Sequence, residues 1–215
     1  IVGFLSLAFF FYAITHLNLG SAMTLNYTSP IFLGFFLPFI SHQKIKKSIL
    51  FCTIIGFMGA LLILDPHGEW QNWFAGLVGL ISGIGAALAY IHVIQLSKLN
   101  EPDWRTVFYF TFISTIGSGL WISLTDYQKL IWDDLWILIP LGLSATIAQI
   151  AMTRAYRLGN TLVIGALSYL TIVFSGVISL LYFNETMRME DVLGAILIIV
   201  SGAIASNISL KSRIN

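Results

Sequence analysis

Residues 74–97 read FAGLVGLISGIGAALAYIHVIQLS, an apolar stretch without a single charged side chain. A helix rising about 1.5 Å per residue needs about 17–25 residues to cross a hydrocarbon core about 30 Å thick. Seven more uncharged stretches of similar length fill most of the chain: Ile1–Leu17, Ser21–Ser41, Ser48–Leu64, Thr106–Leu124, Leu135–Thr153, Asn160–Phe183 and Val192–Leu210. The sequence therefore predicts an all-α polytopic membrane protein with eight transmembrane helices.

The charged residues lie in the gaps between these stretches, and the sign of the charge alternates from gap to gap. When the gaps are assigned alternately to two sides, the side that holds Lys44, Lys46 and Lys47 receives nine of the eleven basic residues. The other side receives eight of the ten acidic residues. Short loops rich in Lys and Arg stay in the cytoplasm. We therefore expect the lysine loop and the C-terminal tail, residues 211–215, in the cytoplasm, and the Asp133–Asp134 loop outside.

The composition excludes several classes of protein. Only 10% of the residues are charged, against about 25% in a soluble domain. The net charge of +1 offers no concentrated basic face, so we expect no nucleic-acid partner. Four scattered histidines and the single Cys52 form no recognisable metal motif, and no P-loop is present. We expect no metal, no cofactor and no enzymatic activity.

The first three spans resemble the last three. Matching residues recur at one constant offset: Gly3 with Gly142, Leu19-Gly20 with Leu158-Gly159, and Ser29 with Ser168. Corresponding loops differ in charge, which places them on opposite sides of the membrane, as in the inverted repeats of secondary transporters. We expect residues 1–64 to be the last three helices of a first repeat, 65–73 an external linker, and 74–210 a second repeat of five helices. A complete first repeat needs two more spans before Ile1, so we expect a ten-helix fold that is N-terminally truncated here.

Three segments carry a family resemblance. They are Leu25–Pro30, the Gly59-Ala60-Leu61-Leu62 run before an acidic loop, and the loop that begins at Glu185. Together they resemble the EamA-type repeats of the drug/metabolite transporter superfamily. The resemblance implies a carrier of the bacterial inner membrane that exports amino acids or other small metabolites by alternating access. In one departure from the family pattern, Gln43 stands where the first repeat usually has an acidic residue.

Candidate substrate-binding residues lie near the middle of two spans. Pro30 deprives one carbonyl of its partner, that of Asn26, beside the polar side chains of Tyr27, Thr28 and Ser29. Such a cluster is either a ligand contact or a helix kink satisfied by neighbouring helices. Ser168 and Tyr169 are the repeat partners of Ser29 and Pro30, and they would face the same cavity if substrate binds between the repeats. A buried structural role for Tyr169 is the alternative.

Further candidates lie in the inner halves of the fourth and sixth spans. Tyr90 and Gln149 are predicted to contact substrate, and His92 is a candidate for proton coupling because it lies well inside a span. A histidine that only hydrogen-bonds a carbonyl is the alternative for His92. Gly79 and Gly83 form a small-xxx-small pair that predicts close helix packing.

Two functions of different classes fit these observations. The first is a secondary transporter whose partners are the lipid bilayer and a small-molecule substrate, with a homodimer left open. The second is a non-transporting membrane scaffold or degenerate paralogue whose helices only pack. Polar groups that converge on one cavity would favour the transporter, and dispersed, individually satisfied polar groups would favour the scaffold.

Overall fold

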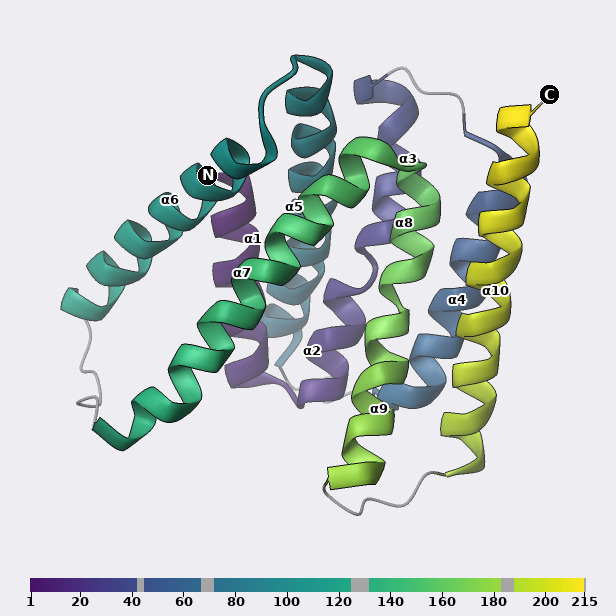
Figure 1. Cartoon of the computed structure of the whole chain (residues 1–215). Helices are drawn as coiled ribbons and strands as arrows, with labels where there is room; N and C mark the ends of the chain where they lie inside the picture. Colours follow the sequence, from purple (N-terminus) through teal and green to yellow (C-terminus); the bar gives the residue numbers. More distant parts are fainter. Residues whose placement is uncertain (42–44, 67–71, 125–131, 183–187, 215) are drawn as a thin grey trace. The chain divides into compact units, whose positions relative to one another are not determined.

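In the computed structural model, the described residues are 1–41, 45–66, 72–124, 132–182 and 188–214, and these ranges contain helices but no strand (Figure 1). The chain packs into two compact units, which we describe separately. The two-helix unit comprises His92–Leu158 together with Ile1, and the main unit comprises Val2–Ile91 and Gly159–Asn215.

The predicted spans are confirmed within a few residues at each end. Seven helical segments are long and apolar enough to cross a membrane, if the two halves of each interrupted span are counted together. They begin with Leu19–Ser41, Lys47–Leu64, Trp73–Lys98 and Asp103–Leu124, and continue with Leu135–Leu158, Thr161–Tyr182 and Met189–Lys211. The eighth, α1 (Val2–His16), is a shorter apolar helix of 15 residues. The chain is therefore a multi-pass membrane protein.

The two-helix unit contains the end of α5 (Trp73–Lys98), α6 (Asp103–Leu124), the short 3-10 helix η2 (Trp132–Asp134) and α7 (Leu135–Leu158). An arginine near the end of α7 holds the connection between α5 and α6. The Arg157 guanidinium donates to the carbonyl oxygen of Glu101 at 2.9 Å and to a carboxylate oxygen of Asp103 at 3.0 Å. These bonds tie the start of α6 to the end of α7.

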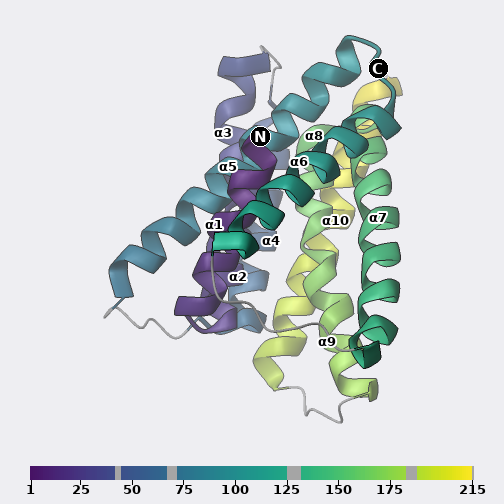
Figure 2. The same cartoon turned by 90° about the vertical axis from the view of Figure 1, so that its left-hand side faces the viewer.

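The main unit is built around an antiparallel pair, α4 (Lys47–Leu64) and α10 (Met189–Ile214), with α8 (Thr161–Ser168) and α9 (Leu170–Tyr182) beside α10 in both views (Figures 1 and 2). Gly59 and Gly194 let α4 and α10 approach closely. A methyl group added at Gly59 would stand 2.6 Å from the carbonyl oxygen of Gly194, which is far inside van der Waals contact. Small residues therefore set the separation of this pair.

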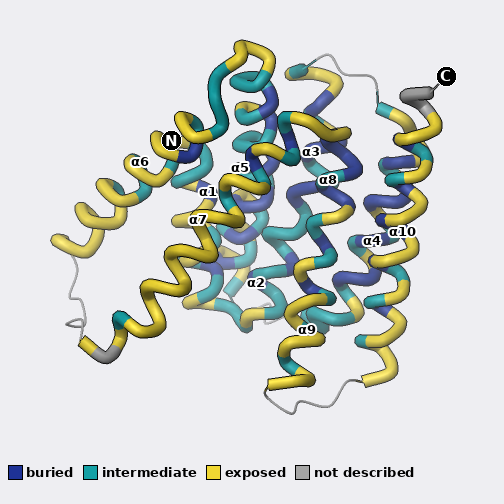
Figure 3. Tube along the Cα trace, viewed as in Figure 1, coloured by how far each residue is buried: buried dark blue, intermediate teal, exposed yellow. Residues whose placement is uncertain are grey.

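Buried positions follow α4, α8 and α10 (Figure 3). One apolar cluster joins these three helices through Ile49, Cys52, Leu162, Val163, Ala166 and Ala205. A second cluster, closer to the start of α10, contains Ala60, Tyr169, Ile172 and Ile198. The core of the main unit thus lies between helices from both ends of the sequence.

Two spans are broken in the middle. The second span divides into α2 (Leu19–Asn26) and α3 (Ser29–Ser41), and the seventh divides into α8 and α9 at Tyr169. The first break corrects the kink predicted at Pro30, because the helix ends completely at Asn26 and Pro30 lies in the first turn of a new helix. Proline suits that position, since the amide that it lacks has no partner in the first turn of any helix.

Asparagine caps begin both broken spans. The side-chain oxygen of Asn18 accepts from the amide of Ser21 at 2.7 Å, and that of Asn160 accepts from the amides of Leu162 and Val163. Each cap satisfies amides that the first turn would leave without a partner. An eight-residue helix follows each cap, and a thirteen-residue helix follows each break.

The predicted packing role of the α5 glycines is confirmed. A methyl group at Gly83 would lie 2.6 Å from the carbonyl oxygen of Leu25, and one at Gly79 would lie 2.9 Å from the Leu25 side chain. Both glycines therefore bring α5 against α2 inside the main unit.

Candidate functional site

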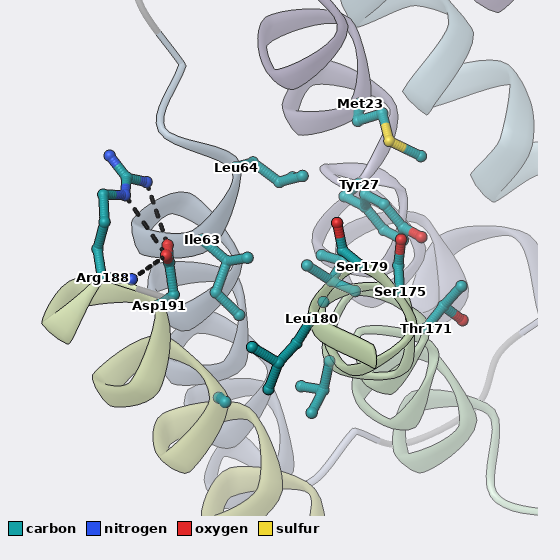
Figure 4. A pocket seen from close by; sticks show the side chains of 14 residues that line it. Met23, Tyr27, Ile63, Leu64, Thr171, Ser175, Ser179, Leu180, Arg188 and Asp191 are labelled. Atoms are coloured by element: carbon teal, nitrogen blue, oxygen red, sulfur yellow. Dashed lines mark hydrogen bonds and ion pairs between the residues drawn. The ribbon is translucent and has the colours of Figure 1, made fainter. Parts of the chain in front are cut away.

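A cavity of about 430 Å³ lies in the main unit, between the ends of four helical segments. This volume falls within the range of about 300–1,000 Å³ that is usual for small-molecule sites. The cavity is lined by Met23, Tyr27, Ile63, Leu64, Thr171, Ile172, Val173, Ser175, Gly176, Ser179, Leu180, Arg188, Asp191 and Ala195 (Figure 4). Its walls come from α2, α4, α9 and α10.

One wall of the cavity carries a row of hydroxyl groups. Thr171, Ser175 and Ser179 recur every four residues on α9, so they share one face of the helix. Figure 4 shows them beside Tyr27, which follows the last residue of α2. This wall offers several hydrogen-bond donors and acceptors to a bound molecule within otherwise apolar surroundings.

A charged group stands on the other side of the cavity, at the start of α10 (Figure 4). The Arg188 guanidinium donates to both carboxylate oxygens of Asp191, at 3.1 and 3.4 Å, and its backbone amide donates to the same residue at 2.8 Å. It also forms an ion pair with Asp65, the residue that caps the end of α4. Hydrogen bonds to Asp191 and then to Asp65 raise the pKa of Arg188 above its usual value. The charged group therefore links α4 to α10.

The backbone of Tyr27 is held by a hydrogen bond from Tyr169. The hydroxyl of Tyr169 donates to the backbone carbonyl of Tyr27 at 3.2 Å, and the two rings lie 6.0 Å apart. Tyr169 itself is fully buried and does not line the cavity. The structure therefore brings together two of the residues that the sequence singles out, but only Tyr27 faces the cavity.

The polar neighbours of these tyrosines take part in packing. The Asn26 amide donates to the hydroxyl of Ser82 on α5 at 3.1 Å. The Ser168 hydroxyl donates to the carbonyl of Gly165 within its own helix at 2.7 Å. Ser29 and Pro30 are buried, and a methyl group added at Gly165 would lie 3.1 Å from the Pro30 ring. None of these four predicted site residues lines the cavity.

The remaining candidates lie elsewhere in the chain. Tyr90 is half-buried near the point where α5 leaves the main unit, and it does not line the cavity. His92 and Gln149 belong to the two-helix unit, where His92 is exposed and Gln149 half-buried. The carbonyl of Gln149 accepts from the hydroxyl of Thr153 at 2.8 Å. The sequence position Gln43, where the family's acidic residue is missing, lies outside the described residues.

Sequence reasoning missed the hydroxyl row on α9. The spacing of Thr171, Ser175 and Ser179 was available as a signal, because residues four apart share a helix face. The link between Arg188 and Asp65 was not readable, since the two residues are 123 positions apart. Among the described residues, no three His, Cys, Asp or Glu side chains are placed to hold a metal ion.

The fold and the cavity together define a multi-pass membrane protein with a site of small-molecule size. The chain belongs to the EamA-like transporter family, whose profile matches residues 1–65 and 73–207. It is similar to the pseudopaline exporter of Pseudomonas aeruginosa, with 27% identity over 94% of this chain and 70% of that protein. An uncharacterised transporter of Helicobacter pylori is 31% identical over the same shares of the two chains.

A solved crystal structure has the same fold. It superposes on this chain with a TM-score of 0.86 and covers 97% of it, although the sequences are only 17% identical. The match extends over 74% of that chain.

Proposed function

We propose that the protein is a secondary transporter of the bacterial inner membrane that exports small metabolites by alternating access, with its substrate in the cavity beside α9. The observation that carries this proposal is the hydroxyl row of Thr171, Ser175 and Ser179, which lies beside Tyr27 on one side of a cavity of about 430 Å³. The pseudopaline exporter supports the outward direction, and family membership supports transport itself.

The location of the cavity fits a site between two inverted repeats. Met23, Tyr27, Ile63 and Leu64 come from residues 1–64, and the other lining residues come from residues 74–210. The antiparallel course of α4 and α10, the last helices of the two proposed repeats, supports the same arrangement. Carriers built from inverted repeats bind substrate at the repeat interface, where discontinuous helices expose backbone groups.

The lining indicates what kind of substrate the cavity accepts. Its surface is mainly aliphatic, with uncharged hydroxyls along one wall and one arginine–carboxylate group at one side. A small molecule with a partly apolar body and a few hydrogen-bonding groups is complementary to such a lining. Amino acids belong to this class, and we take them as the probe.

The scaffold alternative predicts that every polar group is used in packing. Asn26 and Ser168 meet that prediction, because each hydrogen-bonds another helix residue. Thr171 also hydrogen-bonds a protein group, the side chain of Tyr27. Ser175 does not meet the prediction, since its side chain is exposed and lines the cavity. The hydroxyl row therefore favours the transporter.

The test uses cells that express the full chain and are loaded with radiolabelled amino acids. We expect the wild type to export at least one of them, and the triple variant Thr171→Val, Ser175→Ala, Ser179→Ala to export it about tenfold or more slowly, since each lost hydrogen bond contributes about 0.5–1.5 kcal/mol. Ser144→Ala is the matched control, because the Ser144 hydroxyl bonds only the Leu141 carbonyl of its own helix, at 2.9 Å. Wild-type export by the triple variant would remove the cavity from the transport path, and absence of export by the wild type would refute an amino-acid exporter.

A further inference from the structure

We propose that Tyr169 is a positioning residue, whose hydroxyl couples the break in the α8–α9 span to the break in the α2–α3 span and thereby fixes Tyr27 in the cavity wall. The proposal rests on the proposed function, because it assigns Tyr169 a role in shaping the same cavity. It differs from a substrate contact, since Tyr169 is 0% exposed and does not line the cavity.

The acceptor of the Tyr169 hydroxyl is a carbonyl that the helix break leaves without its usual partner. In an unbroken helix the amide of Ile31 would bond the carbonyl of Tyr27. Here the amides of Ile31 and Phe32 both bond the carbonyl of Thr28 instead, at 3.0 and 3.1 Å. A partly buried carbonyl without a partner is unfavourable, so the hydroxyl that reaches it at 3.2 Å stabilises this particular break.

The donor also sits at a break. Tyr169 is the residue between α8 and α9, and its own carbonyl accepts from the amide of Ile172 at 3.0 Å. One hydrogen bond therefore connects the two points at which the membrane spans are interrupted. Because breaks in helices are the places where spans bend most easily, a change of angle at one break is transmitted to the other.

Packing fixes the direction of the Tyr169 hydroxyl. The ring lies against α4 at Gly56, where an added methyl group would stand 2.9 Å from its Cδ2 atom. The Phe57 ring lies 6.3 Å away on the same helix. A ring enclosed in this way can hardly turn, so its hydroxyl stays directed at the Tyr27 carbonyl.

The consequence for transport runs through Tyr27. Its side chain lines the cavity, and its backbone is the acceptor of the Tyr169 bond. If the hydroxyl is removed, α2 and α3 are free to change their angle, and Tyr27 no longer has one fixed position beside the hydroxyl row. Substrate binding then weakens although no group that touches substrate has been changed.

The experiment measures the angle of the first break directly. Cysteines replace Leu19 on α2 and Phe39 on α3, both well exposed, in a Cys52→Ala background, and carry spin labels in the full chain reconstituted into lipid nanodiscs. We expect a narrow distance distribution by double electron–electron resonance in the parent protein and a broader one in Tyr169→Phe, which keeps the ring and loses only the hydroxyl. Gly56→Ala keeps the hydroxyl but displaces the ring, so it should broaden the distribution too.

Tyr182→Phe is the matched control. It removes the same hydroxyl from a tyrosine on α9 that is 78% exposed, so its distribution should equal that of the parent protein. An unchanged distribution in Tyr169→Phe would overturn the proposal, and so would equal broadening in Tyr182→Phe.

Transport supplies a second readout. For an amino acid that the parent protein exports, Tyr169→Phe should raise the apparent KM about two- to tenfold, the factor that corresponds to the loss of one hydrogen bond, at equal protein in the membrane. An unchanged KM would contradict the positioning role. The distance measurement needs no substrate, so absence of amino-acid export by the parent protein would refute an amino-acid exporter while the distances still decide whether the two breaks are coupled.

Discussion

Arg188 lies between carboxylates from two helices, and this position shows how a single residue can link two helix ends beside a cavity. Its guanidinium contacts Asp191 on α10 and Asp65 at the end of α4, with Glu190 3.7 Å away. Isolated ion pairs at exposed positions contribute little to stability. Charge-assisted bonds that engage one guanidinium at several nitrogens are stronger and have a defined geometry. Arg188 therefore links the end of α4 to the start of α10.

We predict that Arg188→Gln loosens the start of α10 without unfolding the main unit. The variant loses the ion pairs to Asp65 and Asp191, whereas the apolar cluster around Ile198 stays intact. Amide hydrogen exchange should become faster over residues 189–195 and stay unchanged over residues 198–208. Arg105→Gln is the control, because its pair with Glu101 lies in the other unit. Unchanged exchange near the start of α10 would show that the ion pairs of Arg188 are not needed to hold this end of the helix.

Among the elements, the α4–α10 pair depends most directly on residue size. Gly59 and Gly194 lie against each other's backbone, so a side chain at either position must separate the helices. Backbone atoms cannot move aside as the end of a flexible side chain can. The pair therefore tolerates no enlargement where the two glycines meet.

We predict that Gly59→Ala destabilises the protein by about 1–3 kcal/mol, the usual cost of overpacking. Thermal unfolding in detergent, followed by circular dichroism, measures the effect as a lower transition temperature. Gly76→Ala is the matched control, because no atom lies within 4 Å of a methyl group added there, and alanine is the better helix former. If both variants unfold at the same temperature, the close approach of α4 and α10 does not limit stability.

The exact positions of the two helix breaks could not be predicted from the sequence. Hydrophobic length sufficed for the helix ends, because charged residues cannot enter the hydrocarbon core. Pro30 indicated an irregularity in the second span, yet the chain breaks at Tyr27–Thr28, and Tyr169 breaks the seventh span without any proline. The donor that stabilises the first break is the hydroxyl of Tyr169, 142 positions away from the Tyr27 carbonyl that accepts it, and no local pattern reveals such a partner.

The candidate site was predicted only in part for a related reason. Periodicity identifies which residues share a helix face, but not which face meets a cavity. Tyr27 is predicted as a substrate contact near an interruption, and the structure places it in the cavity lining. Repeat alignment predicts Ser168 as a site residue, but its hydroxyl donates a hydrogen bond to the Gly165 carbonyl one turn earlier in its own helix. The row at Thr171, Ser175 and Ser179 becomes visible only when α9 is placed against α2 and α10.

For the whole molecule, the distribution of charge makes a prediction about sidedness. Asp65 and Arg188 belong to two different gaps that the alternating assignment puts on one side, and they meet at one end of the main unit. The excess of basic residues in the other gaps predicts that those gaps lie in the cytoplasm. The contact between Asp65 and Arg188 agrees with the alternation, and the direction across the membrane is a prediction from the lysines and arginines.

We predict that a cysteine at Asp134 reacts with an impermeant thiol reagent on intact cells, and that a cysteine at Lys46 does not. Both positions are exposed, and the background is Cys52→Ala, which removes the single native thiol. Lys46 should react only after the membrane has been permeabilised. The opposite pattern, with labelling at Lys46 alone, would invert the topology.

The hydroxyl row also suggests how the substrate specificity of such a protein would change in evolution. Its three members belong to one helix, and two of them, Thr171 and Ser175, are exposed to the cavity and do not belong to the buried clusters. Substitutions at such positions usually change stability by no more than about 0.5 kcal/mol. In the proposed transporter, the framework and the selectivity would thus be encoded by different residues. Point mutations on α9 would then redirect it to another solute while the α4–α10 framework is inherited unchanged.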